Sequence, residues 1–418
     1  MSGGVLPRRT AVIVFLAFAF AYFLSALVRA VTATLAPTLA DEFALQASDL
    51  GLLAGGYFLG FSATQLPLGT WLDRHGPRKV ALGFLGVAVV GSLVFSVATG
   101  FSGLLAGRVL CGAGVSACLM APLTGYRRWL EPTAQMRANS WMLMTGSLGM
   151  VASTLPVQWA LPVVGWRPLF WGLAALIVLS MVLIAVWVPR WEPAPHGGTP
   201  AAADTPAPPG YAMVWRHPYF LRLAPLGFFI YGGMVAMQTL WAGPWMQRVA
   251  GYTPLASATG LFWINVSMLC TFWTWGMVSP WLQRRGYGAD RLMAAGLPLC
   301  LVVLLGIIVA GPQAGGGAWA LFCVSCTFVS LSQPAVALAF PSALAGRALS
   351  AYNLVIFSGV FVVQWGIGLA VDAFAALGLA TVASFQAAMA VYLACNVAAY
   401  AWFMLRGRRH NVLQTSAP

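Results

Sequence analysis

Residues 69–82 read GTWLDRHGPRKVAL, and five of the seven residues from 73 to 79 are ionisable: Asp73, Arg74, His75, Arg78 and Lys79. The surrounding chain is 60% hydrophobic and only 7% charged, with a mean hydropathy of +0.82. Because soluble domains usually carry about 25% charged residues, a chain of 418 residues with so little charge could not cover a water-facing surface. The composition therefore predicts a polytopic membrane protein, in which this stretch is a charged loop between two spans.

Apolar runs close to the length that a helix needs to cross a bilayer, about 20 residues, recur along the whole chain. The first follows Arg8 and Arg9, and it is too long for the apolar core of a signal peptide, so we interpret it as an uncleaved first span. Twelve runs are found: 11–36, 50–71, 80–98, 103–125, 138–161, 168–188, 221–244, 256–281, 292–311, 318–340, 352–374 and 383–405.

The 22 Lys and Arg residues are distributed unevenly between the two sides of the predicted membrane. If the N-terminus is cytoplasmic, eighteen lie inside, only Arg167 and Arg248 lie outside, and Arg29 and Arg108 lie within spans. Basic loops face the cytoplasm, so we expect a multi-pass protein of the cell membrane, a bacterial inner membrane, with both termini cytoplasmic. The same distribution explains the net charge of +13 without a nucleic acid as partner.

One segment differs from the rest in composition. Residues 189–218 are rich in Pro, Ala and Gly and lack apolar periodicity, which predicts an extended, mobile cytoplasmic linker. It separates an N-terminal unit, residues 1–188, from a C-terminal unit, residues 219–418, with six predicted spans in each. We expect the two units to form a monomer in the lipid bilayer.

The two units share sequence at a constant offset of 210 residues. WLDRHG at 71–76 then falls on WLQRRG at 281–286, and RANS at 137–140 falls on RALS at 347–350. Each match is weak alone. Both matches, however, pair a loop or span of the first unit with the loop or span at the same position in the second unit. The sequence therefore predicts an all-α membrane protein of twelve transmembrane helices in two pseudo-symmetric six-helix bundles.

Three motifs give the chain a family resemblance over essentially its whole length. The opening stretch resembles the loop between spans 2 and 3 of the major facilitator superfamily of secondary transporters. RVLCGAG at 108–114 is similar to that family's span-4 pattern, and GWRPLF at 165–170 is typical before its span 6. The antiporter pattern of span 5 is absent, since GSLGMVASTLP at 146–156 keeps only Gly146, Gly149 and a displaced Pro156. The resemblance implies a transporter that works by alternating access, and neither an enzyme nor a protein with a cofactor.

The resemblance also implies a role for the opening loop as a latch that holds the cytoplasmic side shut. Asp73 would meet a helix N-terminus of the other half, while the basic residues pair with acids or cap carbonyls. Gln283 replaces the acid in the second repeat, so the N-terminal copy should dominate. The alternative is an ordinary solvated turn. The predicted gating residues are Gly69, Asp73, Arg74, Gly76, Arg78 and Lys79.

Arg29 and Arg108 are the two basic residues within the predicted spans. Charge inside a span is costly and marks candidate functional sites, and two guanidinium groups at similar depth could clamp an anion in bidentate fashion. The resembled anion–cation symporter branch uses an arginine late in span 1 to bind an organic carboxylate. The alternatives are that Arg29 reaches toward the headgroups and that Arg108 is a structural hydrogen-bonding hub beside span 1.

No acid lies in the middle of a predicted span, and the four histidines fall in cytoplasmic segments. Facilitated diffusion or anion exchange therefore fits better than proton symport, with Asp372 as the fallback proton carrier. Cys323 and Cys326 form a CxxC within an apolar run that no second Cys/His pair accompanies, so no metal site is predicted. Neutral candidates for contact with the substrate are Tyr22, Tyr57, Gln65, Gln238 and Asn353.

These observations predict a secondary active or facilitative transporter of a small organic anion. The runner-up is an efflux transporter of drugs or other hydrophobic compounds with the same fold, favoured by 18 Trp and 24 Phe. A membrane scaffold or sensor that does not transport is a third possibility, against which the intact loop and span-4 motifs argue. No G-x-x-x-x-G-K-[ST] loop occurs, so ATP hydrolysis by this chain is not expected.

Overall fold

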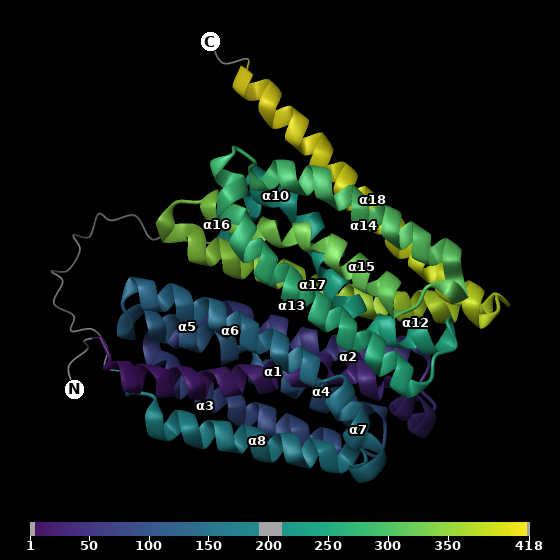
Figure 1. Ribbon diagram of the computed structural model, residues 1–418, viewed down its shortest axis with the longest axis horizontal. Coiled ribbons are helices and arrows are strands. Elements are labelled where there is room, and N and C mark those ends of the chain that lie inside the picture. Colours follow the sequence, from purple (N-terminus) through teal and green to yellow (C-terminus); the bar gives the residue numbers. More distant parts are fainter. Residues whose placement is uncertain (1–4, 192–210, 416–418) are drawn as a thin grey trace.

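A computed structural model describes residues 5–191 and 211–415, and every regular element among them is helical. The first half of the chain forms one bundle, coloured from purple through blue to teal in Figure 1. Its helices are α1 (Arg8–Phe43), α2 (Ala47–Ala63), α3 (Gln65–Ser96), α4 (Phe101–Val115), α5 (Ala117–Trp129), α6 (Pro132–Ala152), α7 (Leu155–Val164) and α8 (Trp166–Trp187).

The second half forms a second bundle, coloured green to yellow, beside the first (Figure 1). Span 7 is built from several short segments, including two π-helical turns, η1 and η2. The elements are α9 (Tyr211–Arg216), α10 (Pro218–Pro225), η1 (Leu226–Tyr231), α11 (Gly232–Ala236), η2 (Met237–Trp241), α12 (Ala242–Arg248), α13 (Pro254–Arg284), α14 (Ala289–Ala310), η3 (Gly311–Gln313), α15 (Gly316–Cys326), η4 (Thr327–Leu331), α16 (Ser332–Leu338), α17 (Ser342–Ala376) and α18 (Thr381–Thr415).

The helices agree with the predicted membrane spans. Ten helices in the described residues are long and apolar enough to cross a bilayer, and the pair Ala134–Ala152 and Leu155–Val164, bent by 43°, makes an eleventh span. The remaining span is α2, of 17 residues, which continues past a break at Thr64 into the first part of α3. The prediction of an all-α membrane fold in two six-helix bundles is confirmed.

The charged loop lies within α3, which holds parts of two spans. Gly76 has φ 76° and ψ 165°, so the helix is broken there. The rings of Trp71 and Phe84 lie 5.6 Å apart, although thirteen residues of continuous helix would separate them by about 20 Å. The chain therefore reverses direction at Gly76, and span 2 ends where span 3 begins.

Replacing Gly76 with alanine is expected to destabilise the protein by about 1–3 kcal/mol, because only glycine adopts this backbone conformation readily. A Cβ at this position would also collide with Trp191, whose ring packs on Trp129 at 6.2 Å. Thermal unfolding in detergent measures the effect. Gly69→Ala is the matched control, because a Cβ there meets nothing within 4 Å. Equal stability of the two variants would contradict the prediction.

We call the side where α1 and α9 begin and α8 ends the linker side, and the opposite side the far side (Figure 1). The bundles meet most closely along α2 and α17, where a Cβ on Gly51 or Gly55 would press against α17. These contacts run from the far-side ends of both helices to Phe61 and Phe357, whose rings are 4.5 Å apart. The bundles are therefore joined from the far side to mid-depth.

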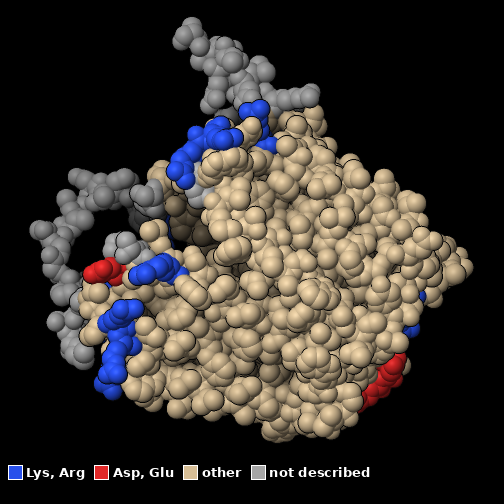
Figure 2. Space-filling model, viewed as in Figure 1, with Lys and Arg blue, Asp and Glu red and all other residues tan. Residues whose placement is uncertain are grey.

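The surface has an uncharged belt. Figure 2 shows Lys and Arg gathered mainly on the linker side, with a broad tan surface beyond them that suits a hydrocarbon environment. On the same side the surface is hollowed between the two bundles (Figure 2).

Two local expectations differ from the structure. Residues 211–216, assigned to the extended linker, form the helix α9, because Val214 is fully buried against the second bundle. Residues 192–210 of the linker lie outside the described residues, and the limits of the two units remain a prediction. Span 7, predicted to end at residue 244, continues helically through Gly243 and Pro244 and ends at Arg248. Its irregular parts are the π-helical turns η1 and η2 upstream of these two residues.

Candidate functional site

Arg29 lies on α1 at the junction of the two bundles. Its guanidinium interacts with the side chains of Tyr22 and Tyr57, and its Cζ stands 5.7 Å from the ring centroid of Phe61. Its Nε is buried without a hydrogen-bond partner among the described residues. Three of the residues predicted to contact substrate, Arg29, Tyr22 and Tyr57, are thus brought together.

The second bundle contributes a chain of hydrogen-bonded polar side chains near Arg29 and Tyr22. Tyr231, at the end of η1, lies close enough to Arg29 and Tyr22 for electrostatic interaction. Its hydroxyl donates to Oε1 of Gln333 at 3.4 Å, and Nε2 of Gln333 donates to Oδ1 of Asn353 at 2.7 Å. Spans 7, 10 and 11 are therefore linked at the level of Arg29, and Asn353 belongs to that link.

Arg108 lies next to this cluster and directs two of its three donor nitrogens at carbonyls of α1, while its Nε, like that of Arg29, is buried without a partner among the described residues. It is fully buried, its Nη1 donates to the carbonyl of Val28 at 2.8 Å, and its Nη2 is 3.5 Å from the carbonyl of Arg29. Its Cζ stands 5.0 Å from the ring of Tyr57, so one tyrosine separates the two guanidinium groups. Arg108 fastens α4 to α1, and its role in an anion clamp remains a prediction.

The other predicted contact residues, Gln65 and Gln238, form hydrogen bonds within their own bundles. Gln65 is buried and donates to the carbonyl of Phe61 at 3.3 Å. Gln238 is buried and donates to Oδ1 of Asn265 at 2.8 Å, inside the second bundle. Neither is placed with Arg29 by the contacts that the structure describes, and their roles as substrate ligands also remain predictions.

Sequence reasoning missed Tyr231. The available signal is the sequence FFIYGGM at 228–234, in which a tyrosine precedes two glycines inside an apolar span. Gly232 packs against the backbone of α17 at Gly359 and Val360, and the turn before it is π-helical. π-Helical turns are frequent at functional sites, but their positions cannot be predicted from the sequence.

The predicted gating loop is attached to its own bundle. Arg78 donates to the carbonyl of Val188 at 3.2 Å and to that of Ala185, and so caps the end of α8. Asp73, Arg74 and Lys79 are exposed. Among the described residues, the ion pairs are Arg167–Glu42 at 2.6 Å and Arg222–Asp290 at 2.5 Å, each within one bundle. The latch function of the loop therefore stays a prediction.

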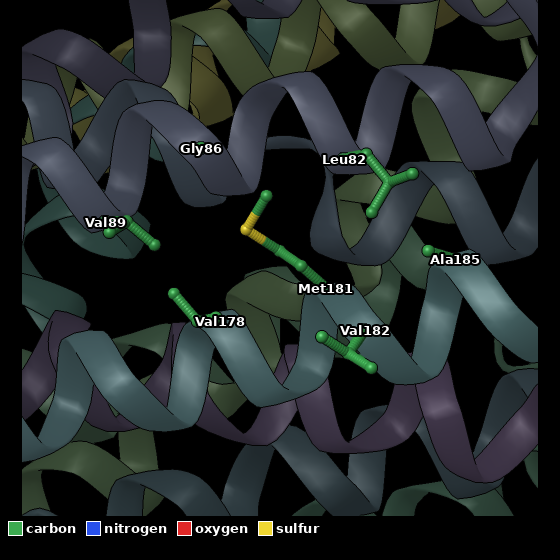
Figure 3. A pocket seen from close by; sticks show the side chains of 7 residues that line it. All are labelled: Leu82, Gly86, Val89, Val178, Met181, Val182 and Ala185. Atoms are coloured by element: carbon green, nitrogen blue, oxygen red, sulfur yellow. The ribbon is translucent and has the colours of Figure 1, made fainter.

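Two surface hollows lie away from Arg29. The first, about 390 Å³, lies between α3 and α8. It is lined by apolar residues alone, so it offers an anion no hydrogen-bond donor (Figure 3). The second, about 510 Å³, lies beside the gating loop and includes His75 and Lys79. Within the described residues no group of three His, Cys, Asp or Glu side chains is placed to hold a metal ion.

Several curated proteins are similar to parts of the chain. The probable sulfoacetate transporter SauU of Cupriavidus necator is 25% identical over 55% of this chain and 56% of its own length. The 4-hydroxybenzoate transporter PcaK of Acinetobacter baylyi is 28% identical over 36% of this chain and 33% of its own. The multidrug transporter mfsC of Aspergillus fumigatus is 25% identical over 37% and 30%. The chain thus spans less than two thirds of each of these relatives.

Solved structures extend the likeness to the whole fold. A bacterial homolog of the human lysosomal transporter Spinster, in an inward-facing and unoccupied conformation, superposes with a TM-score of 0.76 at 17% identity. The match covers 96% of this chain and 98% of that one. The family model described as Major Facilitator Superfamily matches residues 18–364. The chain is therefore a membrane transporter, not an enzyme, and belongs to the Major Facilitator Superfamily.

Proposed function

We propose that the protein carries a small organic anion across the membrane by alternating access, and that Arg29 binds the anionic group. The observation that supports this proposal is the placement of Arg29 between the two bundles, with a buried and unpartnered Nε. The arginine would offer its remaining donors to a carboxylate or a similar oxyanion. Arg108 would position α1, and thus Arg29, through the carbonyls of Val28 and Arg29.

The electrostatic setting of Arg29 favours an anion over a cation. A cation within a membrane protein is costly unless it is paired or solvated. The ionisable groups that interact with Arg29 in the described structure are Tyr22, Tyr57, Tyr231 and Cys118, and none of them is a carboxylate. An arriving anion would balance this charge, whereas a cationic drug would meet repulsion.

The names of the relatives support an anionic cargo and also leave drug efflux as an alternative. The names of SauU and PcaK refer to sulfoacetate and 4-hydroxybenzoate, which are both anions. The name of mfsC refers to multidrug transport, and the contact of Phe61 with Phe357 provides an apolar surface beside Arg29. An efflux transporter of hydrophobic compounds is therefore the second candidate.

The proposed orientation places the linker side in the cytoplasm. Lys and Arg gather on this side (Figure 2), and basic residues remain on the cytoplasmic side of membrane proteins. The bundles are joined on the far side, as shown by the contact of Phe61 with Phe357 and those beyond it, and hollowed on the linker side. This arrangement would correspond to a state open to the cytoplasm, in a monomer of the cell membrane.

Counterflow in proteoliposomes tests the proposed function. Vesicles that contain the protein are loaded with an unlabelled candidate, and uptake of the labelled compound is followed for a panel of carboxylates, a sulfonate, a neutral sugar and a lipophilic cation. We expect uptake of one or more anions that the other anions inhibit and the cation does not. Uptake of the cation without uptake of any anion would favour the efflux alternative.

A further inference from the structure

A carboxylate of the second bundle caps a helix of the first at the far side. Asp372 lies near the far-side end of α17. Its Oδ1 accepts from the backbone N–H of Ala47 at 3.2 Å, and its Oδ2 accepts from that of Ser48 at 2.7 Å. These two residues open α2, so the contact joins the two bundles directly.

The chemistry of a helix N-terminus makes this contact favourable. The first N–H groups of a helix have no partner within it, and they carry a partial positive charge that an anion stabilises. A second acid, Asp49, acts at the same place from within the first bundle, because its Oδ2 accepts from the N–H of Gln46 at 3.0 Å. The N-terminus of α2 thus holds two carboxylates, of which only Asp372 crosses between the bundles.

The same helix pair has a comparable arrangement at its other end. Span 2 and α17 run antiparallel, so the linker-side end of span 2, which carries Asp73, lies on the same side as Ser342, where α17 begins. Asp73 is exposed in this structure, whereas Asp372 is engaged. Each of the two helices therefore carries an acid near its C-terminal end, on the side where the other helix has its N-terminus.

We propose that Asp372 is a positioning residue of the transport cycle, which holds the bundles together on the far side. The proposal rests on the alternating access of the proposed function, but not on the nature of the cargo. Opening the far side requires both hydrogen bonds from α2 to Asp372 to break. When the linker side then closes, Asp73 could contact the N-terminus of α17. Asn353 and Phe357 lie on the same helix as Asp372, so a cargo that moves α17 at Arg29 also acts on this contact.

The backbone geometry makes the contact specific to the closed far side. A Cβ on Gly51 would collide with the carbonyl of Gln364, and one on Gly368 with that of Ala47. The two backbones are therefore in direct contact on either side of the bonds from Asp372. Moving α2 away from α17 at the far side would remove both bonds.

Spin-label distances across the far side test the proposal. Labels are attached to cysteines at Val163 and Leu377, which are 83% and 75% exposed and belong to different bundles. The background replaces the exposed Cys270 and the half-buried Cys395 by serine. In Asp372→Asn we expect the population with the longer distance to rise about fivefold or more, since charge removal at a partly buried helix N-terminus typically has an effect of this size.

Three further variants make the outcome decisive. Asp49→Asn is the matched control, because it removes a carboxylate from the same helix N-terminus without crossing the bundles, and its distances should equal those of the parent. Asp372→Glu should restore part of the short population, and Asp73→Asn should shift the distances in the direction opposite to Asp372→Asn. Equal distances in Asp372→Asn and the parent, or equal shifts in Asp372→Asn and Asp49→Asn, would overturn the proposal.

The readout separates this proposal from the proposed function. The distances are measured without cargo, so a shift in Asp372→Asn supports the far-side contact even if counterflow shows that no anion is carried. Conversely, anion uptake with unchanged distances in Asp372→Asn leaves the cargo assignment intact and removes the role of Asp372.

Discussion

Replacing Arg29 with alanine is expected to lower the affinity for the anion about 100-fold, because a charge-assisted hydrogen bond to a buried ligand contributes a few kcal/mol. The protein should still fold, since the side chain of Arg29 contacts tyrosines at the junction of the bundles and its Nε has no partner there. Counterflow of the anion found in the panel, measured against its concentration, gives the change in apparent affinity.

Two variants control this experiment. Arg29→Lys keeps the charge but loses the planar pair of donors, so its affinity should fall between those of the parent and the alanine variant. Arg167→Ala removes an arginine that is paired with Glu42 in the far-side region, and its affinity should match the parent. Unchanged anion uptake in Arg29→Ala would show that the anion binds elsewhere.

The sequence predicted Arg29 because charge inside an apolar span is a strong signal on its own. It could not predict that Tyr231 lies near Arg29, since tyrosine is common in membrane spans and Tyr231 stands at the end of a π-helical turn. The reversal of the chain at Gly76 could be predicted in the same way, because a charged segment that contains a glycine lies between two apolar runs. A local sequence pattern thus reveals that a charged residue is energetically costly in an apolar span. It does not reveal which distant residue contacts that side chain.

Partners far apart in the sequence account for what was not predicted. Asp372 caps Ala47 and Ser48 across more than 300 residues, and the sequence offered it only as a fallback proton carrier. The two interpretations of Arg108 differ in whether its donors reach cargo or the carbonyls of α1, which depends on how closely α4 approaches α1 and α2. Gly112 allows that approach, since a Cβ there would collide with the carbonyl of Tyr57.

Arg29 and Arg108 therefore have different expected effects, although both are arginines at similar depth. Arg108 supports the backbone of α1 at Val28 and Arg29 and lies against Tyr57, which in turn contacts Arg29. A change at Arg108 should reach the anion only through the position of α1. This division of roles can be tested by measuring stability and affinity separately for each variant.

Replacing Arg108 with alanine is expected to lower the free energy of unfolding by about 2–4 kcal/mol, from the lost hydrogen bond to Val28 and the cavity left beside Tyr57. Thermal unfolding in detergent without cargo measures this loss, and Arg29→Ala should not show it. Arg108→Lys, which can keep one bond to a carbonyl, should recover part of the stability. If Arg108→Ala unfolds like the parent while anion affinity falls about 100-fold, both arginines bind the anion directly and the supporting role of Arg108 is wrong.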